Sequence, residues 1–391
     1  MLYAQRLRDA LTPADRAVLK QIAVLAQQQQ SAVFLVGGPV RDCLLRGRIA
    51  EGDLDLAVEG DAAALARLAA DALRGTLTIH ARFGTATVAL ADGRSLDLAM
   101  TRTETYARPG ALPDVTFGPI EADLVRRDFT INAMALRLDG AHFGELIDRH
   151  GGEADLRRGI IRVLHDRSFV DDPTRLFRAA RFEQRFDFQL DDRTRALIPT
   201  ALPVIDQISG DRLRHELELI FGEAQPIKAL RRLQAWGVLR QIDAALAGLE
   251  GVGDQPPQLS IEPFGWWARW LSGLPEIDLD RVAARLNLPR EAAIDLKQVR
   301  DLLGRIAMIG QAARPSIVYR QLQGFTERAL STTAGMIDQP PARENIRRYV
   351  SDWQHATALI DGHRLQALGL PAGPAVGRVL AALRDAVLDG E

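Results

Sequence analysis

Apolar and polar positions follow two different periods along this chain. In the first 145 residues, short apolar and β-branched runs with strand alternation are interspersed with amphipathic helical patterns. From residue 226 onward the helical period dominates, and glycine or proline separates one helix from the next. The predicted helices of the first part lie within 4–30 and at 61–73, and its predicted strands cover 33–36, 52–58, 76–81, 85–90 and 95–100.

These periods predict an α+β fold, in which a small mixed β-sheet head is followed by an all-α neck, body and tail. A chain of 391 residues exceeds one ordinary core, so two or three domains are expected. We expect an N-terminal helical extension (1–30), the head (31–145), the neck (146–224) and an all-helical body and tail (225–391). Residues 101–120 contain three prolines and two glycines and are predicted to form a long loop beside the head.

Composition narrows the class of protein. The formal net charge of −2 argues against a general nucleic-acid coat protein but leaves room for a local basic surface. The single cysteine, Cys43, excludes an internal disulfide and fits a reducing compartment. Residues 1–30 lack the continuous apolar core of a secretory signal, and no stretch approaches the roughly 20 apolar residues of a membrane span. We therefore expect a cytoplasmic protein without a membrane partner.

The stretch FLVGGPVRD contains a strand, a glycine turn and the start of a helix. The apolar run 33–36 ends at Gly37-Gly38, and Pro39 stands where a helix would begin. Free backbone N–H groups at such a helix start can bind phosphate, Gly38 leaves room for close approach, and Arg41 on the first turn adds charge. A plain turn is the alternative for a glycine pair alone.

The next strand carries two aspartates on one face. In GDLDLAV, alternation places Asp53 and Asp55 together, opposite Leu54 and Leu56. Paired carboxylates repel unless a cation lies between them, and Mg²⁺ commonly binds one or two carboxylates together with substrate phosphates. Asp97, on the later strand SLDLAM, is a candidate third carboxylate. Solvated acids on an exposed strand are the alternative in each case.

Two arginine-rich segments follow. The segment DLVRRDFTINA (123–133) carries two successive arginines, one of which could meet a triphosphate near an anionic pocket. In the segment 169–182, Asp172 is predicted to cap a helix that begins at Pro173. Arginines then recur every three residues along that helix and imply an anionic partner, with a solvated helix face as the alternative; they are Arg175, Arg178 and Arg181.

Taken together, GGPVRD, DLD and the segments 123–133, 145–163, 169–182 and 207–221 resemble the motifs of the class II tRNA nucleotidyltransferase and bacterial poly(A) polymerase family, in the DNA polymerase beta superfamily. The resemblance implies a nucleotidyltransferase head in which Asp53 and Asp55 are catalytic and hold Mg²⁺. It further implies that a flexible loop at 101–120 takes part in switching from C to A addition.

The resemblance also implies how the nucleotide is held. Gly38, Arg41 and Arg127 would bind the triphosphate, and Asp172 with Arg175 would read the base, with Arg178 and Arg181 in the same nucleotide-binding set. In this family Glu is more common at the position of Asp171 and Leu at that of Thr174.

The expected function is therefore template-independent addition of CCA to the 3′ end of tRNA from CTP and ATP, with no obligate protein partner. CC-adding, A-adding and poly(A)-adding members share the same motifs, so these remain open alternatives. A catalytically silent RNA-binding protein has no use for the repelling pair Asp53 and Asp55. Nucleotide transfer to a small molecule would not need the long helical body.

Overall fold

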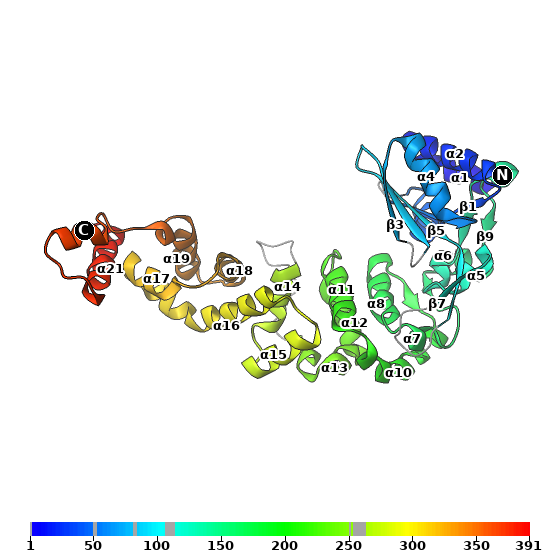
Figure 1. Ribbon diagram of the computed structural model, residues 1–391. Helices are drawn as coiled ribbons and strands as arrows, with labels where there is room; N and C mark the ends of the chain where they lie inside the picture. Colours follow the sequence, from blue (N-terminus) through cyan, green and yellow to red (C-terminus); the bar gives the residue numbers. More distant parts are fainter. Residues whose placement is uncertain (1, 50–52, 81–83, 106–113, 250–251, 253–262) are drawn as a thin grey trace. The chain divides into compact units, whose positions relative to one another are not determined.

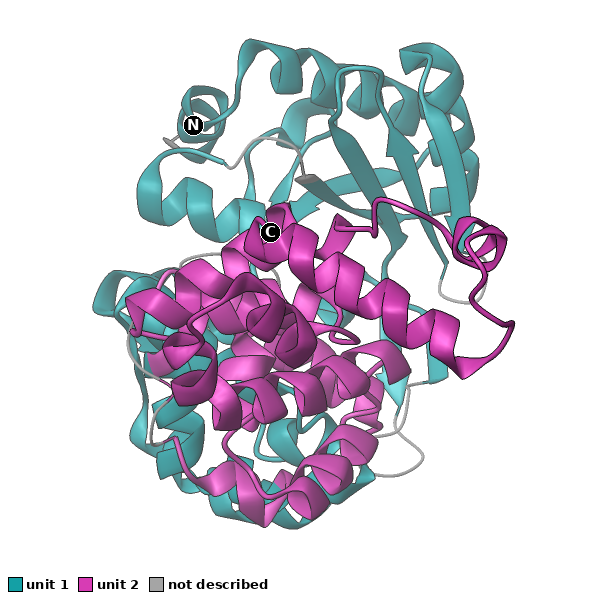
Figure 2. Cartoon of the chain, turned by 90° about the vertical axis from the view of Figure 1, so that its left-hand side faces the viewer, with its two compact units in different colours: residues 1–208, 228–241 teal, residues 209–227, 242–391 magenta. Residues whose placement is uncertain are grey.

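The structure is a computed structural model that describes residues 2–49, 53–80, 84–105, 114–249, 252 and 263–391. The chain forms two compact units (Figure 2). Unit 1 comprises residues 1–208 and 228–241, and unit 2 comprises residues 209–227 and 242–391. The finer boundaries that we expect at residues 30, 145 and 224 stay predictions.

A seven-stranded mixed sheet forms the core of the head (Figure 1). Its strand order is β3-β4-β5-β2-β1-β8-β9, and the β2–β5 pair is parallel while the other pairs are antiparallel. The strands are β1 (Ala32–Val36), β2 (Asp53–Glu59), β3 (Thr76–His80), β4 (Thr85–Ala89), β5 (Ser95–Met100), β8 (Ala135–Arg137) and β9 (Leu146–Ile147). The predicted mixed sheet is confirmed.

One face of this sheet is apolar and covered by helices. Leucines at even positions of β2 and β5 are buried there, among them Leu54, Leu56 and Leu98, because successive residues of a strand point to opposite faces. Helix α4 packs on β3, β4 and β5, and its cap Asp61 accepts a hydrogen bond from the Ala64 N–H. The helices of this N-terminal part of unit 1 are α1 (Leu2–Ala10), α2 (Pro13–Gln28), α3 (Gly38–Arg46) and α4 (Ala62–Leu73).

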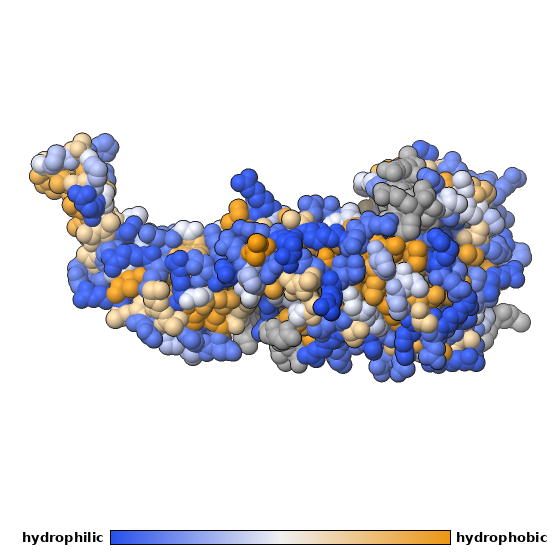
Figure 3. All heavy atoms as spheres, turned by 90° about the horizontal axis from the view of Figure 1, so that it is seen from below, coloured by the Kyte–Doolittle hydropathy of each residue, from blue (hydrophilic) through white to orange (hydrophobic). Residues whose placement is uncertain are grey.

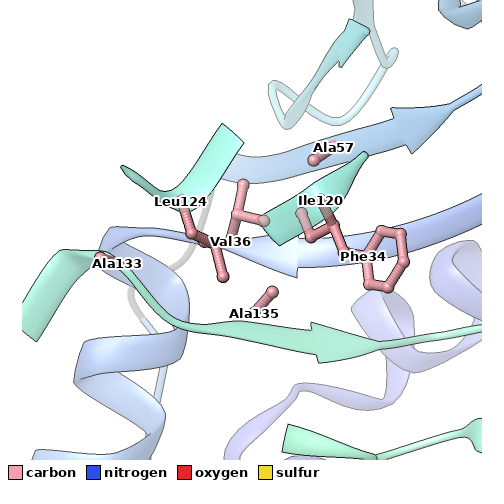
Figure 4. Packing of buried hydrophobic residues seen from close by; sticks show 7 residues of the cluster. All are labelled: Phe34, Val36, Ala57, Ile120, Leu124, Ala133 and Ala135. Atoms are coloured by element: carbon pink, nitrogen blue, oxygen red, sulfur yellow. The ribbon is translucent and has the colours of Figure 1, made fainter. Parts of the chain in front are cut away.

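The opposite face is half covered. Helix α5 (Ile120–Val125) places Ile120 and Leu124 over Phe34 and Val36 of β1, and Figure 4 shows this buried cluster together with Ala57, Ala133 and Ala135. Within the described residues, the part of this face on β2, β5 and β4 carries exposed side chains. Four residues that pair from strand to strand form a row across this face, and the row includes the exposed acids of β2 and β5. From β3 to β2 these residues are Thr78, Thr87, Asp97 and Asp55.

The loop prediction for residues 101–120 is wrong for the flanks of that segment. Strands β6 (Arg102–Thr105) and β7 (Asp114–Phe117) pair antiparallel, with Arg102 opposite Phe117. Threonine, valine and phenylalanine in these flanks favour strand, and this preference outweighs the nearby prolines. Residues 106–113 lie outside the described residues.

The rest of unit 1 is mostly helical. Gly152 allows α6 (Gly152–Arg158) to pack closely on η2 (Thr130–Asn132), because an added Cβ would lie 2.2 Å from the Thr130 carbonyl oxygen. Asp148 accepts hydrogen bonds from the first N–H groups of α6, those of Gly152 and Glu153. The remaining elements are η2 (Thr130–Asn132), η3 (Gly140–His142), α6 (Gly152–Arg158), β10 (Ile160–Ile161), α7 (Ser168–Asp171), α8 (Arg175–Phe186), β11 (Gln189–Leu190), α9 (Asp192–Ala196), α10 (Ile198–Ala201), η4 (Leu202–Gln207), α12 (Pro226–Ala235) and α13 (Val238–Ile242).

Unit 2 is helical throughout the residues that the structure describes, as the periodicity predicts. Phe221 packs against Trp266, Trp267 and Trp270 in its core. Much of the face drawn in Figure 3 is hydrophilic, and none of the described helices is long and apolar enough to cross a membrane. The elements are α11 (Gly210–Phe221), η5 (Ala244–Ala247), α14 (Pro263–Leu271), α15 (Glu276–Arg285), α16 (Arg290–Gln311), α17 (Pro315–Leu322), α18 (Glu327–Met336), α19 (Pro340–Ser351), η6 (Trp353–His355), α20 (Gly362–Ala367) and α21 (Pro374–Asp389).

Candidate active site

The glycine turn between β1 and α3 has the conformation that the sequence predicts. Gly37 is the N-cap of α3 with φ 71° and ψ −129°, and Gly38 and Pro39 occupy the first turn of the helix. A positive φ favours glycine. A side chain at Gly37 would also collide with Arg127, since an added Cβ would lie 2.9 Å from Arg127 Nη1. The turn therefore brings the Arg127 guanidinium group against its backbone.

Two arginines flank this turn. A carbon added at Gly38 would lie 3.5 Å from Arg41 Nη2, so the Arg41 guanidinium is also next to the helix start. Arg41 is buried, and its Nη1 donates to Asn132 Oδ1 at 2.8 Å while the group lies 4.6 Å from the Phe186 ring centroid. Burial lowers the pKa of Arg41, and the neighbouring Asp42 carboxylate partly opposes this shift. Arg41 remains a cation because its ordinary pKa is so high.

Arg127 lies between the turn and a buried carboxylate. Its Nη2 donates to Asp123 Oδ2 at 3.0 Å, and Asp123 is only 1% exposed. Arg127 Nε is buried without a hydrogen-bond partner within the described part of the chain. A buried guanidinium donor with no partner costs free energy unless a ligand satisfies it.

The open face of the sheet brings two aspartates together. Asp55 and Asp97 are paired residues of the parallel strands β2 and β5, so their side chains leave the same face. Both are exposed, and Asp97 Oδ1 accepts a 2.6 Å hydrogen bond from the Thr87 hydroxyl. A carbon added at Gly37 would lie 4.0 Å from Asp55 Oδ2, which places Asp55 next to the turn. Asp53 pairs with Ser95 in the backbone ladder, and its side chain lies outside the described structure.

Asp128 and Asn132 connect α8 to the turn. Asp128 Oδ2 accepts from Arg178 Nε at 2.8 Å, and Asp128 Oδ1 accepts from Asn132 Nδ2 at 3.0 Å. Asn132 in turn holds Arg41. Burial alone would raise the pKa of Asp128, but Arg178 and the Asn132 hydrogen bond outweigh it and lower that pKa.

The predicted start of the arginine-bearing helix is wrong by two residues. Helix α8 begins at Arg175, and Asp172 ends the preceding short helix α7. The Asp172 carboxylate accepts from the Thr174 N–H at 3.3 Å and from the Thr174 hydroxyl at 2.7 Å. This local Asx turn replaces the predicted helix cap, because the hydroxyl of Thr174 competes for the same carboxylate.

The three arginines of α8 have different surroundings. Arg175 is 5% exposed, and its Nη1 donates to Ser168 Oγ at 2.6 Å while Nη2 donates to the Arg126 carbonyl at 2.6 Å. Arg178 reaches Asp128. Arg181 is buried, with its guanidinium 5.5 Å from the Phe182 ring centroid. The structure therefore gathers Gly38, Arg41, Arg127 and Asp55 around the turn, and connects Arg178 to it through Asp128.

Comparisons with known proteins identify the family of this chain. Residues 33–162 match the family described as “Poly A polymerase head domain”, and residues 187–245 match “Probable RNA and SrmB- binding site of polymerase A”. The A-adding tRNA nucleotidyltransferase of Halalkalibacterium halodurans is 31% identical over 94% of this chain and 87% of its own length. The chain belongs to the tRNA nucleotidyltransferase and poly(A) polymerase family.

Other family members show the same likeness. The CC-adding tRNA nucleotidyltransferase of Deinococcus radiodurans is 35% identical over 95% of this chain and 89% of its own. The A-adding enzyme of Geobacter sulfurreducens is 36% identical over 96% of this chain, which spans only 45% of that relative. Among solved structures, a CCA-adding enzyme in apo form II has a TM-score of 0.81 and 31% identity, covering 99% of this chain and 95% of its own.

Sequence patterns did not reveal two features of this candidate site. Buried Asp123 holds both Arg126 and Arg127, with Oδ1 2.8 Å from Arg126 Nη2. Asp123 precedes these arginines by three and four residues, and this spacing favours ion pairs on one turn of a helix. Glu104 also pairs with Arg126, at 3.1 Å from Nη1, and no local spacing could reveal that contact.

Proposed function

We propose that this protein adds CCA to the 3′ end of tRNA from CTP and ATP and releases pyrophosphate. The observation that carries the proposal is the position of Arg127. Its guanidinium lies against the Gly37 turn, next to Asp55, with a buried donor that has no partner among the described residues. A triphosphate at the start of α3 would satisfy that donor and the free N–H groups of the helix. The proposal places the reaction in the cytoplasm and needs no obligate protein partner.

In the proposed reaction, the 3′-hydroxyl oxygen of tRNA attacks the α-phosphorus of the nucleotide. A phosphodiester bond forms, the bond between the α-phosphorus and the bridging oxygen breaks, and pyrophosphate leaves. Arg41 and Arg127 would hold the β- and γ-phosphates and stabilise the charge that develops on the leaving group. Asp97, oriented by Thr87, is the candidate acceptor of the hydroxyl proton.

The acids of β2 suit a divalent cation. Within the described residues no three His, Cys, Asp or Glu side chains are grouped as a complete metal site. The exposed Asp55 carboxylate, together with Asp53 as the proposed second ligand, fits Mg²⁺ because this ion binds few carboxylates and takes its other ligands from water and phosphate. When bound, Mg²⁺ would lower the pKa of the attacking hydroxyl and neutralise charge on the phosphates.

Asp172 and Arg175 are the proposed base-reading pair. A carboxylate accepts a hydrogen bond from the exocyclic amino group of C or A, and a guanidinium donates to a ring nitrogen or carbonyl. U and G present the opposite pattern at these positions and would leave polar groups unpaired. Arg178 and Arg181 complete the proposed nucleotide-binding set from the same helix.

The test uses three tRNA acceptors, which end at the discriminator base, at C and at CC. Each receives CTP, ATP or both with Mg²⁺, and the products are resolved on a sequencing gel. Stepwise CCA on the shortest acceptor is the expected result. Addition of A only to the CC acceptor, or stalling after CC, would overturn full CCA addition in favour of a partial enzyme. The Halalkalibacterium and Deinococcus relatives are named A-adding and CC-adding. Long A tails on any RNA would indicate a poly(A) polymerase.

A further inference from the structure

Arg126 is the centre of a cluster of charged side chains next to the proposed nucleotide site. Its Nη2 lies 2.8 Å from Asp123 Oδ1, and its Nη1 lies 3.1 Å from Glu104 Oε1. The Asp123 and Glu104 side chains are 1% and 6% exposed. Buried carboxylates of this kind are stable only when they are paired and hydrogen-bonded. Arg126 therefore fixes two buried acids that come from different elements, α5 and β6.

The same residue is connected to two of the proposed nucleotide-binding arginines, to Arg127 through Asp123 and to Arg175 directly. Asp123, which Arg126 holds through Oδ1, accepts from Arg127 through Oδ2 at 3.0 Å. The backbone carbonyl of Arg126 accepts from Arg175 Nη2 at 2.6 Å. One residue thus connects the arginine at the phosphate turn with the arginine of the proposed base-reading pair.

Strand β6 supplies the other side of the cluster. Arg102 Nη2 donates to Glu104 Oε1 at 2.8 Å, and the Arg102 backbone N–H donates to Asp123 Oδ1 at 3.3 Å. These hydrogen bonds share the carboxylates of Glu104 and Asp123 and are largely shielded from water. Each bond therefore polarises and restrains its neighbours in the cluster. The position of β6 and the position of the Arg126 peptide are therefore coupled.

We propose that Arg126 and Glu104 are positioning residues for nucleotide selection. On the basis of the proposed function, Arg127 holds the triphosphate and Arg175 reads the base. Arg126 and Glu104 then set the distance between these two arginines. A displacement of about 1 Å in such an arrangement can cost about 100-fold in rate. Loss of the pairing should therefore relax the choice of base, in addition to any loss of stability.

The experiment compares Arg126→Gln and Glu104→Gln with the wild-type protein. For each variant, kcat/KM is measured for CTP and for UTP on a tRNA acceptor that ends at the discriminator base, together with KM for tRNA and Tm. We expect the CTP-over-UTP preference to fall about tenfold or more in Arg126→Gln, with a higher KM for CTP and an unchanged KM for tRNA. Glu104→Gln should shift the preference in the same direction. Arg126→Lys, which keeps the charge but loses the fork, should be intermediate.

Arg137→Gln is the matched control. It removes another partly buried ion pair of the head, that between Arg137 Nη2 and Asp139 Oδ2 at 3.1 Å on β8. The control should lower Tm and leave the CTP-over-UTP ratio unchanged. Because Glu104 and Arg126 act on one pair, the double variant Glu104→Gln/Arg126→Gln should show less than the product of the two single effects.

A lowered Tm with a CTP-over-UTP ratio within about twofold of wild type would reduce the cluster to a structural role and overturn this inference. If Arg126→Gln does not fold, the CTP-over-UTP ratios of Glu104→Gln and Arg126→Lys test the inference instead. A wild-type protein that incorporates neither CTP nor ATP would instead overturn the proposed function, so the two failures are distinguishable.

Discussion

Asp55 is exposed because strand alternation leaves it on the face of β2 opposite the buried leucines. Its replacement therefore leaves the packing of those leucines unchanged. We expect Asp55→Asn to lower the single-turnover rate of CTP incorporation at least about 100-fold, since the amide cannot replace the charge of a metal ligand. Binding of tRNA, measured on filters, should stay close to wild type.

The control for this variant is Asp71→Asn, which changes an exposed acid on α4, over the covered face of the sheet. Turnover of Asp71→Asn should equal that of the wild-type protein. If Asp55→Asn incorporated CTP at the wild-type rate, the proposed metal role of β2 would be refuted.

The lowered pKa of Asp128 should make the free energy of unfolding depend on pH. Its pKa is lower in the folded protein than the usual value, since Arg178 and Asn132 outweigh burial. A carboxylate of this kind contributes stability above its unfolded pKa of about 4, and that contribution is lost as pH falls through the folded pKa. Asp128→Asn should therefore lower the free energy of unfolding by about 1–3 kcal/mol at pH 7. The gap to wild type should narrow as the pH falls below about 4.

Urea unfolding at pH 7 and below about pH 4 measures the difference in free energy of unfolding between Asp128→Asn and the wild-type protein. Asp71→Asn again serves as the control. A gap that stayed constant from pH 7 into the acid range would show that the Asp128 charge does not contribute, and that the shape of the side chain alone matters.

At the scale of elements, Gly152 determines how closely α6 approaches η2. An added Cβ would lie 2.2 Å from a backbone oxygen, which cannot rotate away as a flexible side chain could. Gly152→Ala should therefore lower the free energy of unfolding by about 1–3 kcal/mol. Gly273→Ala is the control, because an added Cβ there meets nothing within 4 Å. Equal urea midpoints for the two variants would contradict the close approach.

The elements that sequence predicts well are those whose cause is local. The β1 strand, the glycine turn and α3 follow from a few consecutive residues, because a positive φ at Gly37 and strand alternation act over that range. The start of α8 was misplaced for an equally local reason, the competing hydroxyl of Thr174. The β6–β7 pairing was missed because three prolines in the segment argued for a loop more strongly than its flanks argued for strand.

Contacts between residues far apart in the sequence depend on tertiary packing. Glu104 and Arg126 are separated by 22 residues, and Arg126 and Arg175 by 49. Their meeting depends on how β6, α5 and α8 pack, which no periodicity encodes. The residues of the proposed site could therefore be named from motifs, whereas the side chains that support them could only be found in the folded chain.

At the scale of the whole molecule, a negatively charged protein must hold a polyanion with local basic surfaces. One such surface lies on α12, where Lys228, Arg231 and Arg232 line a pocket of about 230 Å³ with Gln184 and Ala235. The family region described as a probable RNA-binding site spans residues 187–245 and includes this helix. Lys228 is exposed, and α12 spaces the three cations at positions that share one face of a helix.

If tRNA phosphate lies over this face, Lys228→Ala should raise KM for tRNA and reduce the salt dependence of binding. Each neutralised phosphate contributes about 0.7–0.9 to the slope of log affinity against log salt, so the slope should fall by about one contact. The rate at saturating tRNA and KM for CTP should not change, because α12 is not part of the proposed nucleotide site. Lys20→Ala, at an exposed lysine of α2 outside this pocket, is the charge-matched control. Identical salt slopes for the two variants would remove α12 from the tRNA-binding surface, whereas a slope reduced only in Lys228→Ala would place a phosphate at this pocket.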